Sequence, residues 1–138
     1  CDKGTFVAPI AFEIPGIEML EQEHFGPILH IVRYKASQLD AVVEAINGTG
    51  FGLTCAIHSR IDETIGLVLK RLRVGNDYVD RNHIGAIVGV QPFGGEGLSG
   101  TGPKAGGPRY LHRFACERTV SVDTTAAGGN AALMPLEA

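Results

Sequence analysis

Residues 52–72 read GLTCAIHSRIDETIGLVLKRL, and this stretch decides the fold. Its first part, residues 52–59, is a short apolar run of strand length, which predicts a buried strand. Its second part repeats apolar residues at the i, i+3, i+4, i+7 spacing of one helical face, namely Ile65, Val68, Leu69 and Leu72. We expect Asp62 to cap this helix and Gly75 to close it. The stretch therefore predicts a strand that leads directly into an amphipathic helix.

A second strand and helix precede this stretch. Residues 28–34 (ILHIVRY) form an apolar run, and Ser37 followed three residues later by Asp40 resembles a capping box. Apolar residues again follow helical spacing, at Leu39, Val42, Val43 and Ile46. Asn47 and Gly48 supply a C-terminal stop for this helix.

The order of these elements indicates the fold class. Val79 lies in a third short strand, so the chain reads strand, helix, strand, helix, strand. This alternation predicts an α/β fold with parallel strands and right-handed crossover helices. Residues 5–14 (TFVAPIAFEI) favour an edge or bulged strand because Pro9 interrupts them. Residues 118–124 (RTVSVDT) alternate like an exposed terminal strand, which would invite a partner subunit.

Composition narrows the classes of partner. With 138 residues, 44% of them hydrophobic, the chain is long enough for one domain with a core. The net charge of −3 gives no basic field for nucleic acid or an anionic membrane. The longest apolar runs, such as residues 84–90, are far shorter than the roughly 20 residues of a membrane-spanning helix. These features predict a soluble protein that binds no nucleic acid and has no membrane span.

The cysteines and the first residue add two expectations. Cys1, Cys55 and Cys116 are odd in number and form no CxxC pair, which favours a reducing compartment, the cytoplasm. Cys55 is expected to be an inert buried thiol, and Cys116 an ordinary surface residue. Because the chain begins at Cys1 rather than methionine, we expect it to be part of a longer protein.

The glycine-rich segment 85–107 is too long and polar for a core, and long loops of this kind are often functional. It contains GxGxxG at residues 95–100, but no helix pattern follows, so a dinucleotide fingerprint is not expected. Lys104 follows Pro103 and precedes Ala105, which excludes a Walker A loop. The five histidines have no metal-ligand spacing, so we predict no metal site.

Five segments, taken together, resemble the C-terminal third of aldehyde dehydrogenases. In order they are GTFVAPIAFEI, EQEHFGPILHIV, AINGTGFGLTCAIHSR, VGNDYVDRN and QPFGGEGLSGTGPKAGG. The resemblance implies that residues 1–116 are part of an aldehyde dehydrogenase catalytic domain that uses NAD. It further implies that residues 117–124 form a strand for homo-oligomerisation and that residues 125–138 are a C-terminal tail.

Two residues match positions that form the nicotinamide site in this family, which the resemblance implies for this chain as well. The Glu-x-Phe-Gly-Pro element places its glutamate at Glu23, whose carboxylate would accept hydrogen bonds from the nicotinamide ribose hydroxyls. Phe25 matches the aromatic residue that packs near the nicotinamide ring. Considered without the resemblance, Glu23 would be a surface carboxylate and Phe25 a core residue.

The loop before Pro-Phe-Gly-Gly resembles the substrate loop of glutamate semialdehyde dehydrogenases. In that group, backbone N–H groups at the positions of Gly85 and Ala86 hold the substrate carboxylate. Phe93 matches the aromatic residue that packs on the aliphatic stem of the substrate, although an anchor for the loop itself is nearly as good an explanation. The expected substrate is therefore L-glutamate γ-semialdehyde, which is in equilibrium with 1-pyrroline-5-carboxylate.

The catalytic groups of the family are expected upstream of Cys1. The mechanism that the resemblance implies needs a cysteine nucleophile and a glutamate general base, and no residue of this chain matches either. The residues RNHIGAIVGVQPFGGEGLSGTGPKAGGP and TTAAGGNA look most like bifunctional proline utilization A proteins, in which FAD would belong only to a separate proline dehydrogenase domain. Two alternatives stay open: a non-catalytic assembly module, and an aldehyde dehydrogenase with another substrate.

Overall fold

Residues 54–79 form a strand, a helix and a second strand, as the sequence predicts. In this computed structural model, which describes residues 3–123, these elements are β4 (Thr54–Ile57), α2 (Asp62–Arg71) and β5 (Asn76–Val79). Strands β4 and β5 are parallel, with Thr54 opposite Asn76 and Ile57 opposite Val79. The predicted parallel pair with a crossover helix is thus confirmed here.

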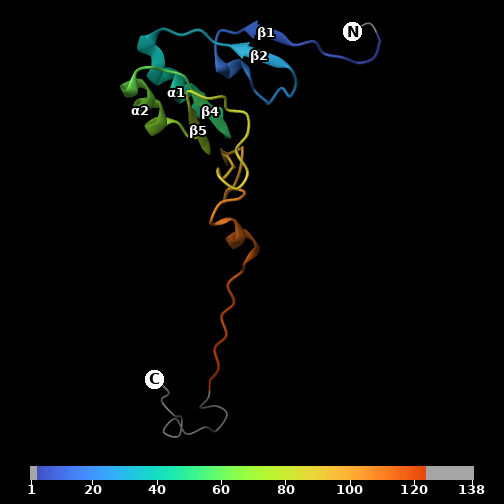
Figure 1. Cartoon of the computed structure of the whole chain (residues 1–138), viewed down its shortest axis with the longest axis vertical. Helices are drawn as coiled ribbons and strands as arrows, with labels where there is room; N and C mark the ends of the chain where they lie inside the picture. Colours follow the sequence, from blue (N-terminus) through green and yellow to red (C-terminus); the bar gives the residue numbers. More distant parts are fainter. Residues whose placement is uncertain (1–2, 124–138) are drawn as a thin grey trace.

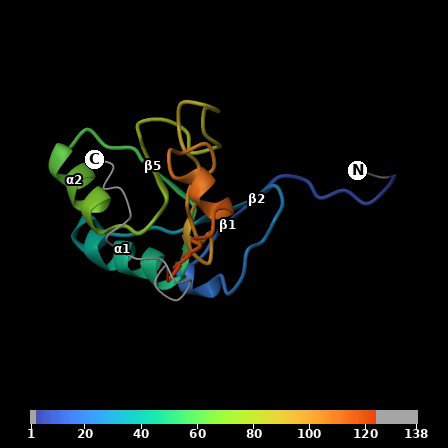
Figure 2. The same cartoon turned by 90° about the horizontal axis from the view of Figure 1, so that it is seen from below.

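Helix α1 (Leu39–Gly48) packs beside α2 on the same face of this strand pair (Figure 2). One cluster of buried apolar side chains joins the two helices to the strand pair, and it consists of Val43, Ile57, Val68 and Leu72. Val43 is the most enclosed of them, at 1% exposure. Burial of such side chains is the main favourable contribution to folding, so this region is the stable part of the described chain.

The N-terminal strands form a separate pair. Strand β1 (Ile10–Glu13) is parallel to β2 (Ile28–Ile31), and the 3-10 helix η1 (Ile17–Met19) lies in their connection. Strand β2 does not pair with β4, and the described residues contain three two-stranded sheets rather than one continuous parallel sheet. The element order suggested one parallel sheet that contains β2, β4 and β5, but of these strands only β4 and β5 pair with each other.

Both predicted helix caps are wrong in detail. The 3-10 helix η2 (Ala36–Gln38) precedes α1, so Ser37 lies inside a turn, and the Gln38 side chain accepts a hydrogen bond from the Lys35 N–H at 3.0 Å. The N-cap of α2 is Ile61, and Asp62 is the first helical residue. Asp62 still favours the helix, because a carboxylate in the first turn interacts with the positive end of the helix dipole.

The glycine-rich segment, residues 85–107, folds back onto the α/β unit, which consists of residues 39–79. Strand β6 (Glu96–Gly97) pairs antiparallel with β3 (Phe51–Gly52), and Phe93 and Ala105 form an isolated antiparallel bridge. The 3-10 helix η3 (Tyr110–Phe114) follows. No α-helix begins between residues 100 and 123, which agrees with the sequence pattern after the GxGxxG glycines.

After η3 the chain extends away from the body of the molecule (Figure 1). No strand is assigned to residues 117–123, so the predicted oligomerisation strand is not confirmed and stays a prediction. Thr124 and the expected tail, residues 125–138, lie outside the described residues. Within residues 3–123, none of the helices has the length and apolar character needed to cross a bilayer.

Candidate functional site

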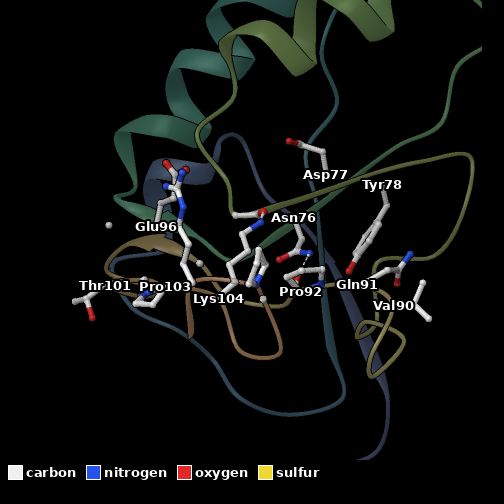
Figure 3. A pocket seen from close by; sticks show the side chains of 18 residues that line it. Asn76, Asp77, Tyr78, Val90, Gln91, Pro92, Glu96, Thr101, Pro103 and Lys104 are labelled. Carbon is white, nitrogen blue, oxygen red and sulfur yellow. Dashed lines mark hydrogen bonds between the residues drawn. The ribbon is translucent and has the colours of Figure 1, made fainter. Parts of the chain in front are cut away.

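Strand β5 holds the glycine-rich segment through alternate side chains. Because successive residues of a strand point to opposite faces, Asn76 and Tyr78 share a face while Asp77 points the other way (Figure 3). The Asn76 amide donates to the carbonyl of Pro92 at 3.0 Å and accepts from the Gly94 N–H at 3.2 Å. Asn76 thereby fixes the backbone on both sides of Phe93.

Tyr78 makes the second attachment. Its side chain is buried, with 6% exposure, and its hydroxyl donates to the carbonyl oxygen of Gly85 at 3.1 Å. The Arg81 guanidinium stacks over the Tyr78 ring, 4.1 Å from the ring centroid, and also donates to the Gln91 side chain at 3.2 Å. The two ends of the 81–91 loop are thus tied to each other and to β5.

A close backbone approach makes the third attachment. A Cβ atom on Gly75 would collide with the carbonyl oxygen of Gly94, so only glycine lets the two segments meet. The Lys104 ammonium donates to the carbonyl of Gly75. Lys104, which the sequence excluded as a phosphate-binding lysine, therefore has a structural role at this junction.

A cavity of about 1040 Å³ lies between β5 and the glycine-rich segment (Figure 3). Asp77, Glu96 and Lys104 line it. Burial raises the pKa of the Asp77 carboxyl, the Lys104 charge opposes that rise, and the Glu96 charge adds to it. The cavity therefore carries charges of both signs rather than a single anion-binding or cation-binding surface.

The cysteines behave as the sequence indicated. Cys55 is half-buried, and burial together with the nearby Asp77 charge raises the pKa of its thiol above the ordinary value of a cysteine. A thiol with a raised pKa is a poor nucleophile at neutral pH, because little thiolate is present. Cys116 is exposed. The structure therefore gives the Cys55 thiol no activating environment of the kind a nucleophile needs.

The two predicted nicotinamide residues lie on the loop between η1 and β2. Glu23 is exposed and lines a cavity of about 570 Å³, together with Phe51 and with Leu98 and Ser99 of the glycine-rich segment. The Phe25 ring is 95% exposed, so its core-filling alternative is wrong within the described residues. The structure thus brings Glu23 next to the glycine-rich segment and leaves the ring of Phe25 open.

The predicted substrate residues fall into two places. Neither the Gly85 N–H nor the Ala86 N–H has an acceptor within residues 3–123. Gly85 is exposed with φ +73°, and Ala86 is half-buried. Phe93 instead lines a cavity of about 340 Å³ with Tyr110 and its neighbours, a cavity to which neither Gly85 nor Ala86 contributes.

Sequence reasoning missed the residues that position these groups: Asn76, Tyr78, Arg81, Gln91 and Lys104. One signal was available, because the period of two along NDYV places Asn76 and Tyr78 on one face of a strand. That signal does not tell which carbonyl each side chain will meet.

Comparisons with known proteins agree on one family. The model of the aldehyde dehydrogenase family matches residues 1–120. The bifunctional protein PutA of Escherichia coli (strain K12) is 53% identical over 135 residues, which is 98% of this chain and 10% of the relative. The 1-pyrroline-5-carboxylate dehydrogenase of Geobacillus sp. (strain WCH70) is 41% identical over 121 residues, 86% of this chain and 23% of the relative.

Solved structures give the same result. A crystal structure of a Bradyrhizobium japonicum proline utilization A variant superposes with a TM-score of 0.81 at 60% identity, covering 90% of this chain and 13% of that chain. A Thermus 1-pyrroline-5-carboxylate dehydrogenase with bound NAD superposes with a TM-score of 0.71 at 40% identity, covering 79% of this chain and 21% of that chain. This chain therefore spans only a small part of the relatives it resembles.

Proposed function

The chain belongs to the aldehyde dehydrogenase family, and from this premise we propose that it is a C-terminal part of the catalytic domain of an NAD-dependent glutamate semialdehyde dehydrogenase. In the full-length enzyme the reaction converts L-glutamate γ-semialdehyde, NAD⁺ and water to L-glutamate, NADH and two protons. The observation that carries the substrate assignment is the pair of free backbone donors at Gly85 and Ala86, in a chain 41% identical to a 1-pyrroline-5-carboxylate dehydrogenase.

The anchor for the substrate carboxylate rests on those two donors. A backbone N–H left without an acceptor is unusual once a site is closed to water, because the missing hydrogen bond costs free energy. A carboxylate oxygen is a suitable acceptor, and neighbouring N–H groups in a loop form an anion-binding concavity. The absence of a side chain at Gly85 lets the anion approach the backbone closely.

Phe93 is proposed to contact the aliphatic stem of the substrate. Support comes from its place in the chain, two residues after Gln91. The Gln91 side chain accepts a hydrogen bond from the Ile87 N–H and so fixes the loop that contains Gly85 and Ala86. Its backbone bridge to Ala105 supports the alternative, in which the ring anchors the loop. Substitution of Phe93 distinguishes the two, since only the first alternative predicts an effect confined to aldehyde binding.

The nicotinamide half-site consists of Glu23 and Phe25. The residues present fit such a site, because an exposed carboxylate on a cavity wall is followed two residues later by an aromatic ring that nothing within residues 3–123 covers. Glu23 would accept hydrogen bonds from the ribose hydroxyls, and Phe25 would orient the nicotinamide ring by apolar contact. NAD, when bound, accepts the hydride that leaves the aldehyde carbon.

The nucleophile and the water-activating glutamate are assigned to sequence preceding Cys1 in the full-length enzyme. The raised pKa of Cys55 supports this, because that thiol is predominantly protonated at neutral pH. The described part of this chain then has three tasks: to hold the nicotinamide ribose, to bind the substrate carboxylate and to complete the sheet of the catalytic domain.

Steady-state kinetics of the full-length enzyme with Glu23→Ala and with Phe93→Ala test these assignments. For Glu23→Ala, loss of a charged hydrogen-bonding partner costs about 1–3 kcal/mol, which corresponds to a fall of roughly 5- to 150-fold in kcat/KM. For Phe93→Ala, loss of the apolar contact should also lower kcat/KM. Glu23→Ala should act on NAD and Phe93→Ala on the aldehyde. Glu21→Ala, an exposed carboxylate on the same loop, is the matched control. Unchanged kinetics in both variants would contradict both roles.

Assembly is a second function, and the segment 117–123 favours it. Val120 and Val122 in this segment are exposed, and alternate apolar residues on one side of an extended chain suit pairing with another sheet. We propose a cytoplasmic homo-oligomer in which this segment adds a strand to a neighbouring subunit. Replacing both valines by lysine should lower the oligomeric mass measured by light scattering, and an unchanged mass would exclude this role.

A further inference from the structure

We propose that Tyr78, whose ring the Arg81 guanidinium covers, is the positioning group that aims the Gly85–Ala86 peptide and so sets the preference for aldehydes that carry a carboxylate. This inference rests on the proposed function, because it assumes that the peptide receives the substrate anion. It concerns residues that lie behind the anchor rather than residues that touch the substrate.

The geometry of one peptide unit determines where the Ala86 N–H points. The carbonyl of Gly85 and the N–H of Ala86 belong to the same planar group, and in a trans peptide they point in opposite directions. The Tyr78 hydroxyl holds that carbonyl at 3.1 Å. The Ala86 N–H must therefore point away from β5, where no acceptor within residues 3–123 meets it. One hydroxyl thus determines the direction of one anchoring donor.

Tyr78 can act as a fixed support because it is buried and held by contacts on several sides. Its ring is 6% exposed, and its backbone lies in β5, parallel to β4, with Ala56 as its partner. The Arg81 guanidinium covers the ring from 4.1 Å. A buried phenol with one good acceptor loses little further freedom when the substrate arrives, which is the condition for preorganised binding.

Gln91 fixes the residue on the other side of the anchor. Its side-chain oxygen accepts from the Ile87 N–H at 3.0 Å, and its own N–H donates to the Ile87 carbonyl at 2.9 Å. The same oxygen accepts from Arg81 at 3.2 Å. Tyr78 thus holds the Gly85 carbonyl of the anchor peptide, and Gln91 holds Ile87, the residue that follows this peptide. Arg81 contacts both Tyr78 and Gln91.

Arg81 also supplies charge. Its guanidinium bonds to neutral oxygens, those of Asn82 and Gln91, and it forms no ion pair with a carboxylate in the described part of the chain. An unneutralised cation behind the two free N–H groups makes the loop more favourable for an anion. The orientation of the anchor peptide and the positive charge of Arg81 therefore both favour binding of a carboxylate.

The test uses two aldehydes that differ only in the carboxylate, 5-oxopentanoate and pentanal, with the full-length enzyme. Tyr78→Phe keeps the ring and removes the hydroxyl. We expect the KM for 5-oxopentanoate to rise roughly 3- to 10-fold, the range of one net hydrogen bond, with kcat retained. The KM for pentanal should not change. Tyr34→Phe, at an exposed tyrosine in another part of the chain, is the matched control.

Gln91→Leu approaches the same peptide from its other side and should give the same selective rise in KM. Equal effects on both aldehydes, or no effect on either, in folded variants with unchanged melting temperatures would overturn the positioning role. A wild-type enzyme that oxidises both aldehydes equally well would instead overturn the proposed function, and the inference with it. An active, acid-selective wild type with unaffected variants would overturn the inference alone.

Discussion

The α/β unit of residues 39–79 and the glycine-rich segment of residues 85–107 are held together by different interactions. The first buries apolar side chains from α1, β4 and α2 against one another. The second contributes no buried large hydrophobic residue within the described chain, and it is fixed by hydrogen bonds from β5 and by close backbone contact. The unit acts as a scaffold, and the segment places binding groups on it.

The consequence is that damage to the first region should unfold the protein, whereas damage to the second should first alter binding. Hydrophobic burial is distributed and non-directional, so it tolerates small shifts in position. A hydrogen bond to one carbonyl is directional, so its loss reorients a particular peptide. The following substitutions in the full-length enzyme test this distinction.

The largest loss of stability is expected for Leu72→Ala. Leu72 belongs to the buried cluster, and truncation of such a side chain costs about 2–5 kcal/mol through lost burial and the cavity left behind. Urea unfolding would measure it. Lys70→Ala, on the exposed side of α2, is the control and should change the free energy of unfolding by less than about 0.5 kcal/mol. Similar losses in both would contradict the assignment of the core.

The next effect is expected for Gly75→Ala, at the junction of the two regions. The added methyl group would collide with the Gly94 carbonyl, and overpacking of this kind costs about 1–3 kcal/mol. The glycine-rich segment should shift, so the KM of the aldehyde should rise as well. Gly66→Ala in α2 is the matched control, because its methyl group meets no atom within 4 Å. There we expect a gain of about 0.5–1 kcal/mol.

A smaller and more selective effect is expected from two asparagines with the same bonding pattern. Asn47 donates to the Arg71 carbonyl and accepts from the Arg73 N–H, both at 2.9 Å, within the scaffold. Asn76 does the same to Pro92 and Gly94 of the glycine-rich segment. Each alanine variant should lose about 1–2 kcal/mol of stability. Only Asn76→Ala should raise the KM of the aldehyde, and equal kinetic effects would remove the distinction.

The smallest effect is expected for Arg71→Met. Arg71 pairs with Asp40 and Glu44, which join α2 to α1, but the two carboxylate side chains are 64% and 63% exposed. Exposed ion pairs contribute about 0–1 kcal/mol, and salt weakens them further. A thermal shift larger than that of Leu72→Ala would show that ion pairs, rather than apolar burial, hold the helices together.

The same distinction explains what the sequence could and could not predict. The spacing of Val68 and Leu72 is a local pattern, and the helix and the burial of these two residues were confirmed. The burial of Leu69 was wrong, because its side chain is 39% exposed. The caps at Ser37 and Asp62 were wrong because a 3-10 turn that contains Ser37 precedes α1 and Ile61 takes the cap position of α2. Local capping patterns do not reveal such shifts of a few residues.

The candidate site was predicted only in part. The resemblance pointed to Glu23, Phe25, Gly85, Ala86 and Phe93, and their roles remain predictions. The support behind them could not be read from the sequence, because the carbonyl that Tyr78 meets is seven residues away and the carbonyl that Asn76 meets is sixteen residues away. Such pairings depend on how the loop returns to the strand, and that path is set by tertiary packing.

The most direct test of the central claim is a crystal structure of the full-length enzyme with L-glutamate bound. We predict that oxygens of the α-carboxylate lie about 2.7–3.2 Å from the backbone nitrogens of Gly85 and Ala86, with the Tyr78 hydroxyl still donating to the Gly85 carbonyl. A carboxylate bound to other groups, with both N–H groups facing solvent or a protein carbonyl, would contradict it.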